Sequence, residues 1–357
     1  MKTLIIAEAG VNHNGELKLA LALVDAAADA GADVVKFQTF NAAALASKRA
    51  PKADYQVRQA GAAESQLDML RRLQLSEDHH RAIIAHCERR GVAFLSSPFD
   101  FESLRLLVDV FGLRTLKFGS GELTNAPLLL EAARSGRRLI LSTGMSTLDE
   151  IREALGVLAF GMTAAPNARP GRAAFEASLN EAGWSALRER VTLLHCTTEY
   201  PAPVAETNLR AMDTMAEAFG LPVGYSDHTE GAAISVAAVA RGAVIIEKHL
   251  TLDRTMAGPD HAASAEPAEF KAMVEAIRDV ELALGDGVKQ PGKTELHNRP
   301  IARKSLVAAR PVAAGRPFTG EDLAIKRPAT GRAPIAYWDT LGEAANRAYA
   351  EDEPLDP

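Results

Sequence analysis

The chain has 357 residues, of which 47% are hydrophobic and 24% are charged, with a formal net charge of -6. Such a chain can form one large domain and a small second one, and its charge excludes a general basic surface for nucleic acid. Its two cysteines give no disulfide framework, which favours a reducing cytoplasm. Because no stretch approaches the roughly 20 apolar residues of a membrane span, no membrane partner is expected.

Short apolar runs alternate with helical patterns along most of the chain. The predicted strands are Leu4–Ala9, Val34–Thr39, Val92–Ser97, Leu116–Gly121, Leu139–Ser142, Val191–Thr197, Val223–Ser226 and Val244–His249. The predicted helices are Leu17–Ala30, Glu77–Arg90, Phe101–Val110, Leu128–Arg134, Thr147–Leu158, Ala211–Phe219, Ala232–Arg241 and Pro267–Leu284. Most of these helices stop near a glycine, as Thr147–Leu158 does near Gly161. Eight strand–helix units predict a (β/α)8 barrel with parallel strands.

Two connections are unusually long. Residues 41–76 leave the carboxyl end of the second strand, where a long loop can act as a lid over an active site. Residues 162–190 join a helix to the next strand, so we expect them on the opposite face, partly mobile and catalytically neutral. The barrel is predicted to occupy residues 1–285, followed by a Gly/Pro/Lys-rich linker at 286–298 and a small, mostly β domain at 299–357.

Each predicted strand ends in polar residues, which a buried strand does not need for stability. They are Glu8, Lys36, Gln38, Ser97, Lys117, Ser120, Glu122, Ser142, Thr198, Tyr200, Ser226, Asp227, His228, Lys248 and His249. The active sites of (β/α)8 barrels lie at the carboxyl ends of their strands. The pattern therefore predicts one shared active site.

His228 and His249 end consecutive strands, so their imidazoles can converge on one divalent metal ion and leave positions open for water and substrate. The alternative is two separate histidines that form hydrogen bonds near the barrel rim. Asp227 and Glu247 are candidates for orienting these imidazoles. Glu247 is more simply interpreted as an outward-facing strand residue.

Lys36 and Lys117 end two other strands and can bind an anion, form a Schiff base or pair with a barrel carboxylate. Four strand ends also carry hydroxyl groups, from Ser97, Ser120, Ser142 and Ser226. Ammonium and hydroxyl groups around one point favour a phosphate or carboxylate ligand. Glu8 and Glu122 are candidates for a general base or for hydrogen bonds to a polyol, and the alternative is an ion pair with one of the lysines.

These residues occur in blocks that resemble the sialic (nonulosonic) acid synthases. The matching blocks are IIAEAGVNHNG, GADVVKFQTF, FLSSPFD, LKFGSGE, LILSTGM, LLHCTTEYPAP, VGYSDHT, IIEKHLTLD and GPDHAAS, and the tail resembles the antifreeze-like (SAF) domain that ends these enzymes. The resemblance covers the chain apart from residues 162–190. It implies a transferase that condenses phosphoenolpyruvate with an N-acylated amino sugar and releases phosphate by C–O cleavage.

The resemblance also implies a role for each matching residue. His228 and His249 match the metal ligands, for manganese or alternatively magnesium or cobalt. The phosphoenolpyruvate contacts are Lys36, Ser97, Lys117, Ser120, Ser142, Thr198 and Ser226. The sugar contacts are Glu8, Gln38, Glu122, Tyr200, Asp260 and Arg327, and we expect Glu122 to handle the proton of the water or the aldehyde. Arg327 is expected to reach the sugar from the tail of the other subunit in a domain-swapped homodimer.

Two departures and one choice remain. Thr198 stands where acetylneuraminate-forming relatives often have Asn, and the tail is shorter than a full SAF domain, so its last element is expected to be missing. The sugar is either N-acetylmannosamine, giving N-acetylneuraminate, or 2,4-diacetamido-2,4,6-trideoxymannose, giving diacetyllegionaminate. The blocks ADYQVRQ, ESQLDMLRRL and CTTEYPAP favour the second. The competing hypotheses are a Schiff-base aldolase on the same barrel and a catalytically inactive sugar-binding protein.

Overall fold

The computed structural model describes residues 2–47, 49–50 and 65–357, and the chain divides after Gly285 into two compact units. Part of the expected lid, residues 48 and 51–64, lies outside the described residues. No helix of the described residues is long and apolar enough to cross a membrane.

Unit 1 contains eight parallel strands in the spatial order β3-β2-β1-β8-β7-β6-β5-β4. Their bounds are β1 Leu4–Gly10, β2 Val34–Thr39, β3 Ala93–Pro98, β4 Thr115–Phe118, β5 Arg138–Ser142, β6 Val191–His195, β7 Val223–Asp227 and β8 Ile245–His249. The two end strands of this order, β3 and β4, also contact each other, which closes the barrel. The predicted (β/α)8 barrel is confirmed.

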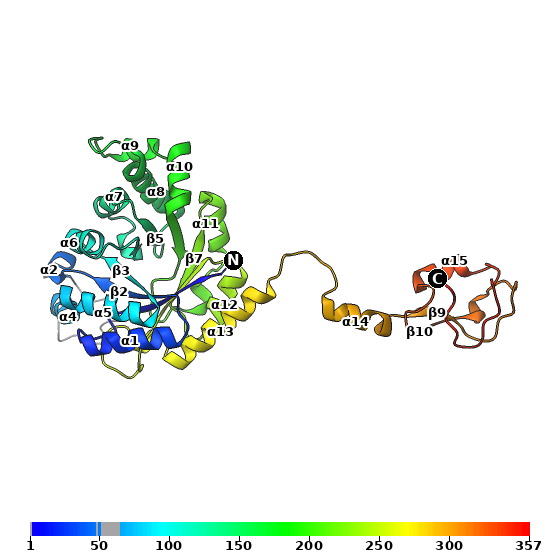
Figure 1. Ribbon diagram of the computed structural model, residues 1–357. Coiled ribbons are helices and arrows are strands. Elements are labelled where there is room, and N and C mark those ends of the chain that lie inside the picture. The colour runs from blue at the N-terminus through cyan, green and yellow to red at the C-terminus, as the bar shows by residue number, and fades with distance from the viewer. Residues whose placement is uncertain (1, 48, 51–64) are drawn as a thin grey trace. The chain divides into compact units, whose positions relative to one another are not determined.

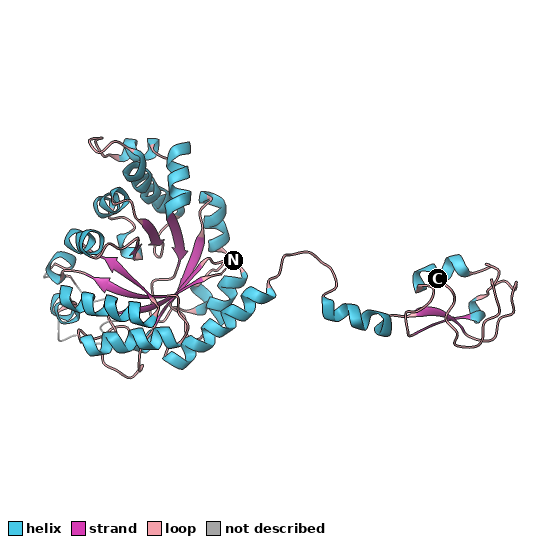
Figure 2. Ribbon diagram, viewed as in Figure 1, coloured by secondary structure: helices cyan, strands magenta, loops and turns pink. Residues whose placement is uncertain are grey.

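Helices surround these strands (Figure 2). Their bounds are α1 Leu17–Asp29, α2 Ala42–Leu45, α4 Gln66–Leu73, α5 Glu77–Arg90, α6 Phe101–Arg105, α7 Ala126–Arg134, α8 Leu148–Thr163, α9 Arg172–Ala177, α10 Glu181–Arg190, α11 Ala211–Phe219, α12 Ala233–Ala240 and α13 Pro267–Ala283. Helices α5 and α11 have the predicted bounds and end at Gly91 and Gly220, which adopt the left-handed conformation that glycine favours.

The predicted end of the helix near Gly161 was wrong. Gly161 lies inside α8, which continues to Thr163, and a Cβ atom there would come within 2.5 Å of the Ala133 Cβ on α7. The glycine therefore allows close packing of two helices rather than a turn. Residues 162–190 also form helices α9 and α10, which the sequence did not predict and which pack against α8 (Figure 1).

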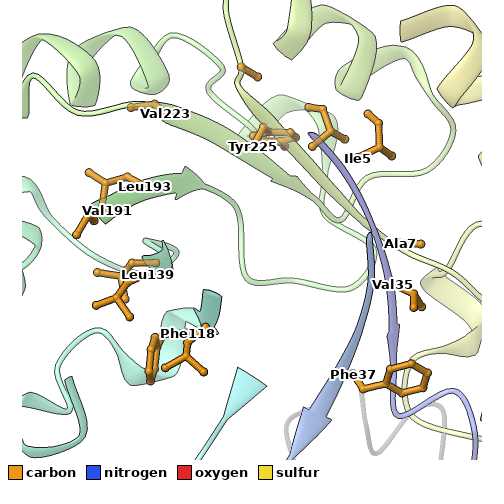
Figure 3. Packing of buried hydrophobic residues seen from close by; sticks show 14 of the residues in the cluster. Ile5, Ala7, Val35, Phe37, Phe118, Leu139, Val191, Leu193, Val223 and Tyr225 are labelled. Carbon is orange, nitrogen blue, oxygen red and sulfur yellow. The ribbon is translucent and has the colours of Figure 1, made fainter. Parts of the chain in front are cut away.

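Side chains alternate between the two faces of each strand, and the outward ones form the main core. Ile5, Ala7, Val35, Phe37 and Tyr225 belong to one buried cluster that also includes side chains of the surrounding helices (Figure 3). Burying this apolar surface supplies the main favourable free energy of folding, at about 25 cal/mol per Å².

The inward side chains form a second, smaller apolar cluster drawn from six strands: Ile6, Val34, Leu95, Ile140, Leu194 and Ile245. Because strand side chains alternate, the residue two positions further along each strand points the same way. Those six residues are Glu8, Lys36, Ser97, Ser142, Cys196 and Glu247, and all six line one cavity. The apolar cluster thus closes the barrel below a polar layer.

Unit 2 contains helix α14 Lys293–Ala302, the antiparallel strands β9 Ser305–Ala308 and β10 Leu323–Lys326, and helix α15 Tyr337–Thr340. Helix α14 occupies part of the predicted linker. Asp322 is the polar centre of this unit, since its carboxylate accepts hydrogen bonds from Thr319 and from the guanidinium groups of Arg310 and Arg316. The unit also has a small hydrophobic core of its own, which includes Leu306, Phe318 and Tyr349.

Candidate active site

A cavity of about 230 Å³ opens above the apolar cluster at the carboxyl ends of the strands. Its walls include every residue to which the resemblance assigns a role except Glu122 and Arg327. Apart from two carboxylate oxygens that pair with Lys36, three buried polar atoms of this wall have no hydrogen-bond partner among the described residues, namely Ser142 Oγ, Thr198 Oγ1 and His249 Nδ1. Buried polar atoms are nearly always hydrogen-bonded. Three unpaired ones around a single cavity therefore indicate a site built for a polar ligand.

The two imidazoles of the predicted metal pair are neighbours in the cavity wall, with ring centroids 5.6 Å apart and ring planes tilted by 59°. His228 donates from Nδ1 to the carbonyl oxygen of Thr197 at 2.6 Å, which leaves Nε2 as its unprotonated nitrogen. Burial lowers the pKa of His228 to about 4 and that of His249 well below its usual value. Both rings are therefore neutral at pH 7, as a metal ligand must be.

A buried ion network forms the floor of the cavity. The Lys36 ammonium lies 2.9 Å from Glu8 Oε2 and 3.4 Å from Glu247 Oε2, and the Lys117 ammonium lies 3.1 Å from Glu247 Oε1. Burial lowers the pKa of Lys117, whereas Glu247 and Glu8 raise the pKa of Lys36 against the effect of burial. Ser226 donates to Glu247 Oε1 at 2.9 Å, so Glu247 is held from three sides.

The two expectations for the acidic neighbours of the histidines were wrong. Glu247 points into the cavity rather than outward, because it lies two positions before the inward-facing His249. Asp227 lies between two inward residues and therefore points outward, where it pairs with Lys248 at 3.0 Å and accepts from Ser235 at 2.6 Å. It makes no contact with either imidazole among the described hydrogen bonds.

The predicted hydroxyl cluster lies together, with the loop after β5 folded against it. Lys36 donates to Ser97 Oγ at 3.3 Å, and Gly144 donates from its backbone nitrogen to Ser120 Oγ at 3.0 Å. A Cβ atom on Gly144 would come within 2.3 Å of Thr198 Oγ1 and 2.8 Å of Ser120 Oγ. Gly144 was not singled out from the sequence. It permits the close approach that brings these two hydroxyl groups together.

Four of the predicted sugar residues line the cavity. Gln38 donates to Glu8 Oε1 at 3.1 Å, and the Tyr200 ring packs against His228 with centroids 4.2 Å apart. Asp260 Oδ2 lies 3.9 Å from His249 Nδ1, and burial together with Glu8 raises the pKa of Asp260 to about 7. The lining also includes the apolar side chains of Met69, Leu70 and Leu73 of α4, which the sequence did not predict.

Two predicted site residues lie elsewhere. Glu122 follows Gly121, but its carboxylate accepts from Asn125 Nδ2 at 2.7 Å and does not line the cavity. The chain turns into a short 3-10 helix after β4, and this turn directs Glu122 towards the start of α7. Its contacts give no support for the predicted proton-handling role. Arg327 lies in unit 2, where its Nε donates to the Ala302 carbonyl at 2.9 Å.

The donor set fits a metal ion that shares its coordination with substrate. No group of three or more His, Cys, Asp or Glu side chains placed to hold a metal ion occurs among the described residues. A structural site would need such a set, whereas a catalytic site keeps positions open. Two neutral imidazoles with available nitrogens, one of them the unpaired His249 Nδ1, match the second case.

Comparison with known proteins decides which family has this cavity. The NeuB family model matches residues 23–289, and the SAF domain model matches residues 303–357. The chain belongs to the NeuB family. The sequence-based prediction of a nonulosonic acid synthase with a C-terminal SAF domain is thereby confirmed.

Individual NeuB relatives cover nearly the whole chain. N,N'-diacetyllegionaminic acid synthase from Campylobacter jejuni is 49% identical, covering 99% of this chain and 98% of its own length. The enzyme of the same name from Legionella pneumophila is 43% identical, covering 96% and 90%. The solved structure of N-acetylneuraminic acid (sialic acid) synthetase from Leptospira borgpetersenii, in complex with citrate, is 32% identical, with a TM-score of 0.66, covering 84% of this chain and 90% of that one.

Proposed function

We propose that this NeuB protein is an N,N'-diacetyllegionaminic acid synthase, which joins phosphoenolpyruvate to 2,4-diacetamido-2,4,6-trideoxymannose. The near-complete match to two proteins of that name, at 49% and 43% identity, carries the choice of sugar. The match to the sialic acid synthetase structure is lower, at 32%. A residual activity with N-acetylmannosamine is compatible with the same cavity.

The cavity floor supplies what an anionic substrate needs. Lys36 and Lys117 are both nearly inaccessible to solvent, and the unpaired hydroxyl groups of Ser142 and Thr198 face the same space. Charged donors in a site of low dielectric bind phosphate and carboxylate groups strongly. We assign Lys36, Ser97, Lys117, Ser120, Ser142, Thr198 and Ser226 to phosphoenolpyruvate.

The remaining polar residues of the cavity wall suit an open-chain sugar. Glu8, Gln38, Asp260 and Tyr200 offer acceptors and donors for hydroxyl and acetamido groups. His228 and His249 are the residues that would hold a divalent metal ion, for which we propose manganese. Such an ion supplies Lewis acidity for the aldehyde oxygen of the sugar.

The proposed reaction forms one C–C bond and breaks one C–O bond. The enol carbon of phosphoenolpyruvate attacks the aldehyde carbon, and water adds to the resulting cationic centre. The hydrated carbon then expels phosphate, which keeps the bridging oxygen. Lys36 and Lys117 stabilise the anionic groups throughout and hold the enol carbon in position, which is where most of the rate enhancement arises.

Steady-state kinetics with each sugar test the proposal. With manganese and phosphoenolpyruvate labelled with 18O at the bridging position, the labelled oxygen should appear in released phosphate. The kcat/KM for the diacetamido sugar should exceed that for N-acetylmannosamine by at least about tenfold. The opposite preference would reject the sugar assignment.

Treatment with borohydride distinguishes a Schiff-base aldolase from the proposed synthase. A Schiff base on Lys36 or Lys117 would be trapped covalently and seen by mass spectrometry, whereas the proposed reaction leaves both lysines unmodified. Chelation with EDTA should abolish turnover, and manganese should restore it. Trapping of a lysine without any effect of EDTA would favour the aldolase. The domain-swapped homodimer and the cytoplasmic location stay predictions.

A further inference from the structure

We propose that Glu247 is a positioning residue that fixes the two phosphoenolpyruvate-binding lysines relative to each other. The inference rests on the proposed function as far as the anionic substrate is concerned, and it does not depend on which sugar is used. The carboxylate of Glu247 lies between two lysines of a site that is proposed to bind an anion, and its presence there needs an explanation.

The geometry shows how one side chain reaches both lysines. Glu247 lies on β8, whereas Lys36 comes from β2 and Lys117 from β4, so one carboxylate connects side chains from three strands that are not neighbours in the barrel. The carboxylate divides between them, with Oε2 at 3.4 Å from Lys36 and Oε1 at 3.1 Å from Lys117. Ser226 donates to Oε1 from the adjacent strand β7 and fixes the plane of the carboxylate.

Affinity for an anion does not explain this residue. A second carboxylate at 3–4 Å from the ammonium groups competes with the substrate for them, and burying it costs several kcal/mol unless it is paired. A neutral hydrogen-bond acceptor would satisfy Ser226 equally well. What the charged group adds is a fixed position for two long, flexible ammonium side chains.

The two lysines depend on Glu247 to different extents. Lys36 has a second carboxylate partner, Glu8, at 2.9 Å. Glu247 is the single carboxylate within ion-pair distance of Lys117 among the described residues. Without it, the Lys117 ammonium has no charged anchor in the substrate-free enzyme, and its four-carbon chain can adopt several rotamers.

These facts predict an unusual pattern for the Glu247→Gln variant. The variant lacks the negative charge that partly neutralises Lys36 and Lys117. The two buried ammonium groups should therefore attract phosphoenolpyruvate at least as strongly as in the wild type, because Coulomb attraction is large in a dry site. The lysines then no longer hold the enol carbon in the reactive orientation, and a displacement of about 1 Å is enough to lower kcat about 100-fold. Binding and turnover should therefore separate.

The experiment measures phosphoenolpyruvate binding by isothermal titration calorimetry and turnover by phosphate release, for the wild type, Glu247→Gln and Glu247→Asp. The expected result is a kcat lowered about 100-fold in Glu247→Gln, with a Kd for phosphoenolpyruvate no higher than that of the wild type. Glu247→Asp keeps the charge and should retain more of the kcat. It also supplies both readouts if the Gln variant does not fold.

Asp227→Asn is the matched control. Asp227 forms a buried ion pair with Lys248 on the same two strands but on the outer face of the barrel. Its variant should lower the melting temperature while leaving kcat and the Kd for phosphoenolpyruvate close to those of the wild type. The same separation of Kd and kcat in this control would show a general effect of lost packing and would overturn the proposal.

Two further results would also overturn it. One is a kcat of Glu247→Gln close to that of the wild type. The other is a Kd for phosphoenolpyruvate that rises by the factor by which kcat/KM falls, since Glu247 would then act on affinity alone. A wrong sugar assignment would look different, because it concerns which sugar the wild type converts and leaves the comparison of variants intact.

Discussion

The imidazole of His228 donates from Nδ1 to the backbone carbonyl of Thr197 over 2.6 Å, which fixes its tautomer and orientation. Thr197 lies just past the end of β6, so the hydrogen bond links two neighbouring barrel strands. Ser226, 3.4 Å from His228 Nε2, donates its proton to Glu247 instead. The Nε2 lone pair therefore stays available for a cation, as backbone-anchored histidine ligands require.

Replacing either histidine should remove metal binding without unfolding the barrel. His228→Ala and His249→Ala should each bind manganese at least about tenfold more weakly by calorimetry, with turnover abolished. His86→Ala, which removes a histidine paired with Asp25 outside the cavity, serves as the control and should bind manganese normally. Retained binding in His249→Ala would exclude it as a ligand.

A single methyl group should disturb the anion site. In Gly144→Ala the new Cβ would lie 2.3 Å from Thr198 Oγ1 and 2.8 Å from Ser120 Oγ, so these hydroxyl groups must move. We expect the KM for phosphoenolpyruvate to rise about tenfold, equivalent to roughly 1.4 kcal/mol. Gly161→Ala makes a comparable clash with Ala133 between two outer helices. It should lower stability alone, and an equal rise in KM there would contradict the local explanation.

The prediction that Arg327 completes the site of another subunit has a direct test. Arg327→Ala should raise the KM of the sugar more than that of phosphoenolpyruvate. If the contact comes from a partner subunit, co-expression of Arg327→Ala with His249→Ala gives mixed dimers in which one of two sites is intact. At low sugar concentration the mixture should recover up to about a quarter of wild-type activity, because half of randomly assorted dimers are mixed. No recovery above the sum of the two variants would place the contact within one chain.

Unit 2 should depend on pH through Asp322. Hydrogen bonds from Thr319 and the Arg310 guanidinium hold the pKa of Asp322 below its usual value of 3.8. The ionised carboxylate thus stabilises the folded unit fully above pH 3.8, and this contribution is lost as the pH falls towards the lowered pKa. Relative to the intrinsic exchange rate at each pH, the protection of the amides of residues 303–357 in the full chain should fall over that range.

Asp322→Ala should remove this pH dependence and cost about 2 kcal/mol, since it leaves several donors without an acceptor. Its hydrogen exchange should already be fast at pH 7. An exchange profile like that of the wild type would show that the network around Asp322 does not stabilise the unit.

Much of the site was predictable because polar residues at the ends of barrel strands have no structural reason to be there. Lys36, Lys117, Ser142 and His249 were found in this way and lie around one cavity. Glu247 was assigned to the outward face, although the alternation of strand side chains places it on the same face as His249. The sequence therefore contained enough information to place Glu247 in the site, because an inward-facing residue at position 249 implies another at position 247.

Other features of the structure could not be predicted from the pattern of polar residues at strand ends. The need for a glycine at position 144 follows from how close the loop after β5 comes to Ser120 and Thr198, which is a tertiary distance. Helices α9 and α10 follow a stretch rich in proline and small residues that is typical of a loop, and packing against α8 stabilises them. Glu122 shares its strand end with true cavity residues but turns away because the backbone forms a 3-10 turn there.

A competition between two sugars tests the central claim most directly. The wild-type enzyme, with manganese and limiting phosphoenolpyruvate, would be given equal concentrations of 2,4-diacetamido-2,4,6-trideoxymannose and N-acetylmannosamine, and the products separated by mass spectrometry. The proposed function predicts diacetyllegionaminate in at least about tenfold excess. A mixture dominated by N-acetylneuraminate would contradict it.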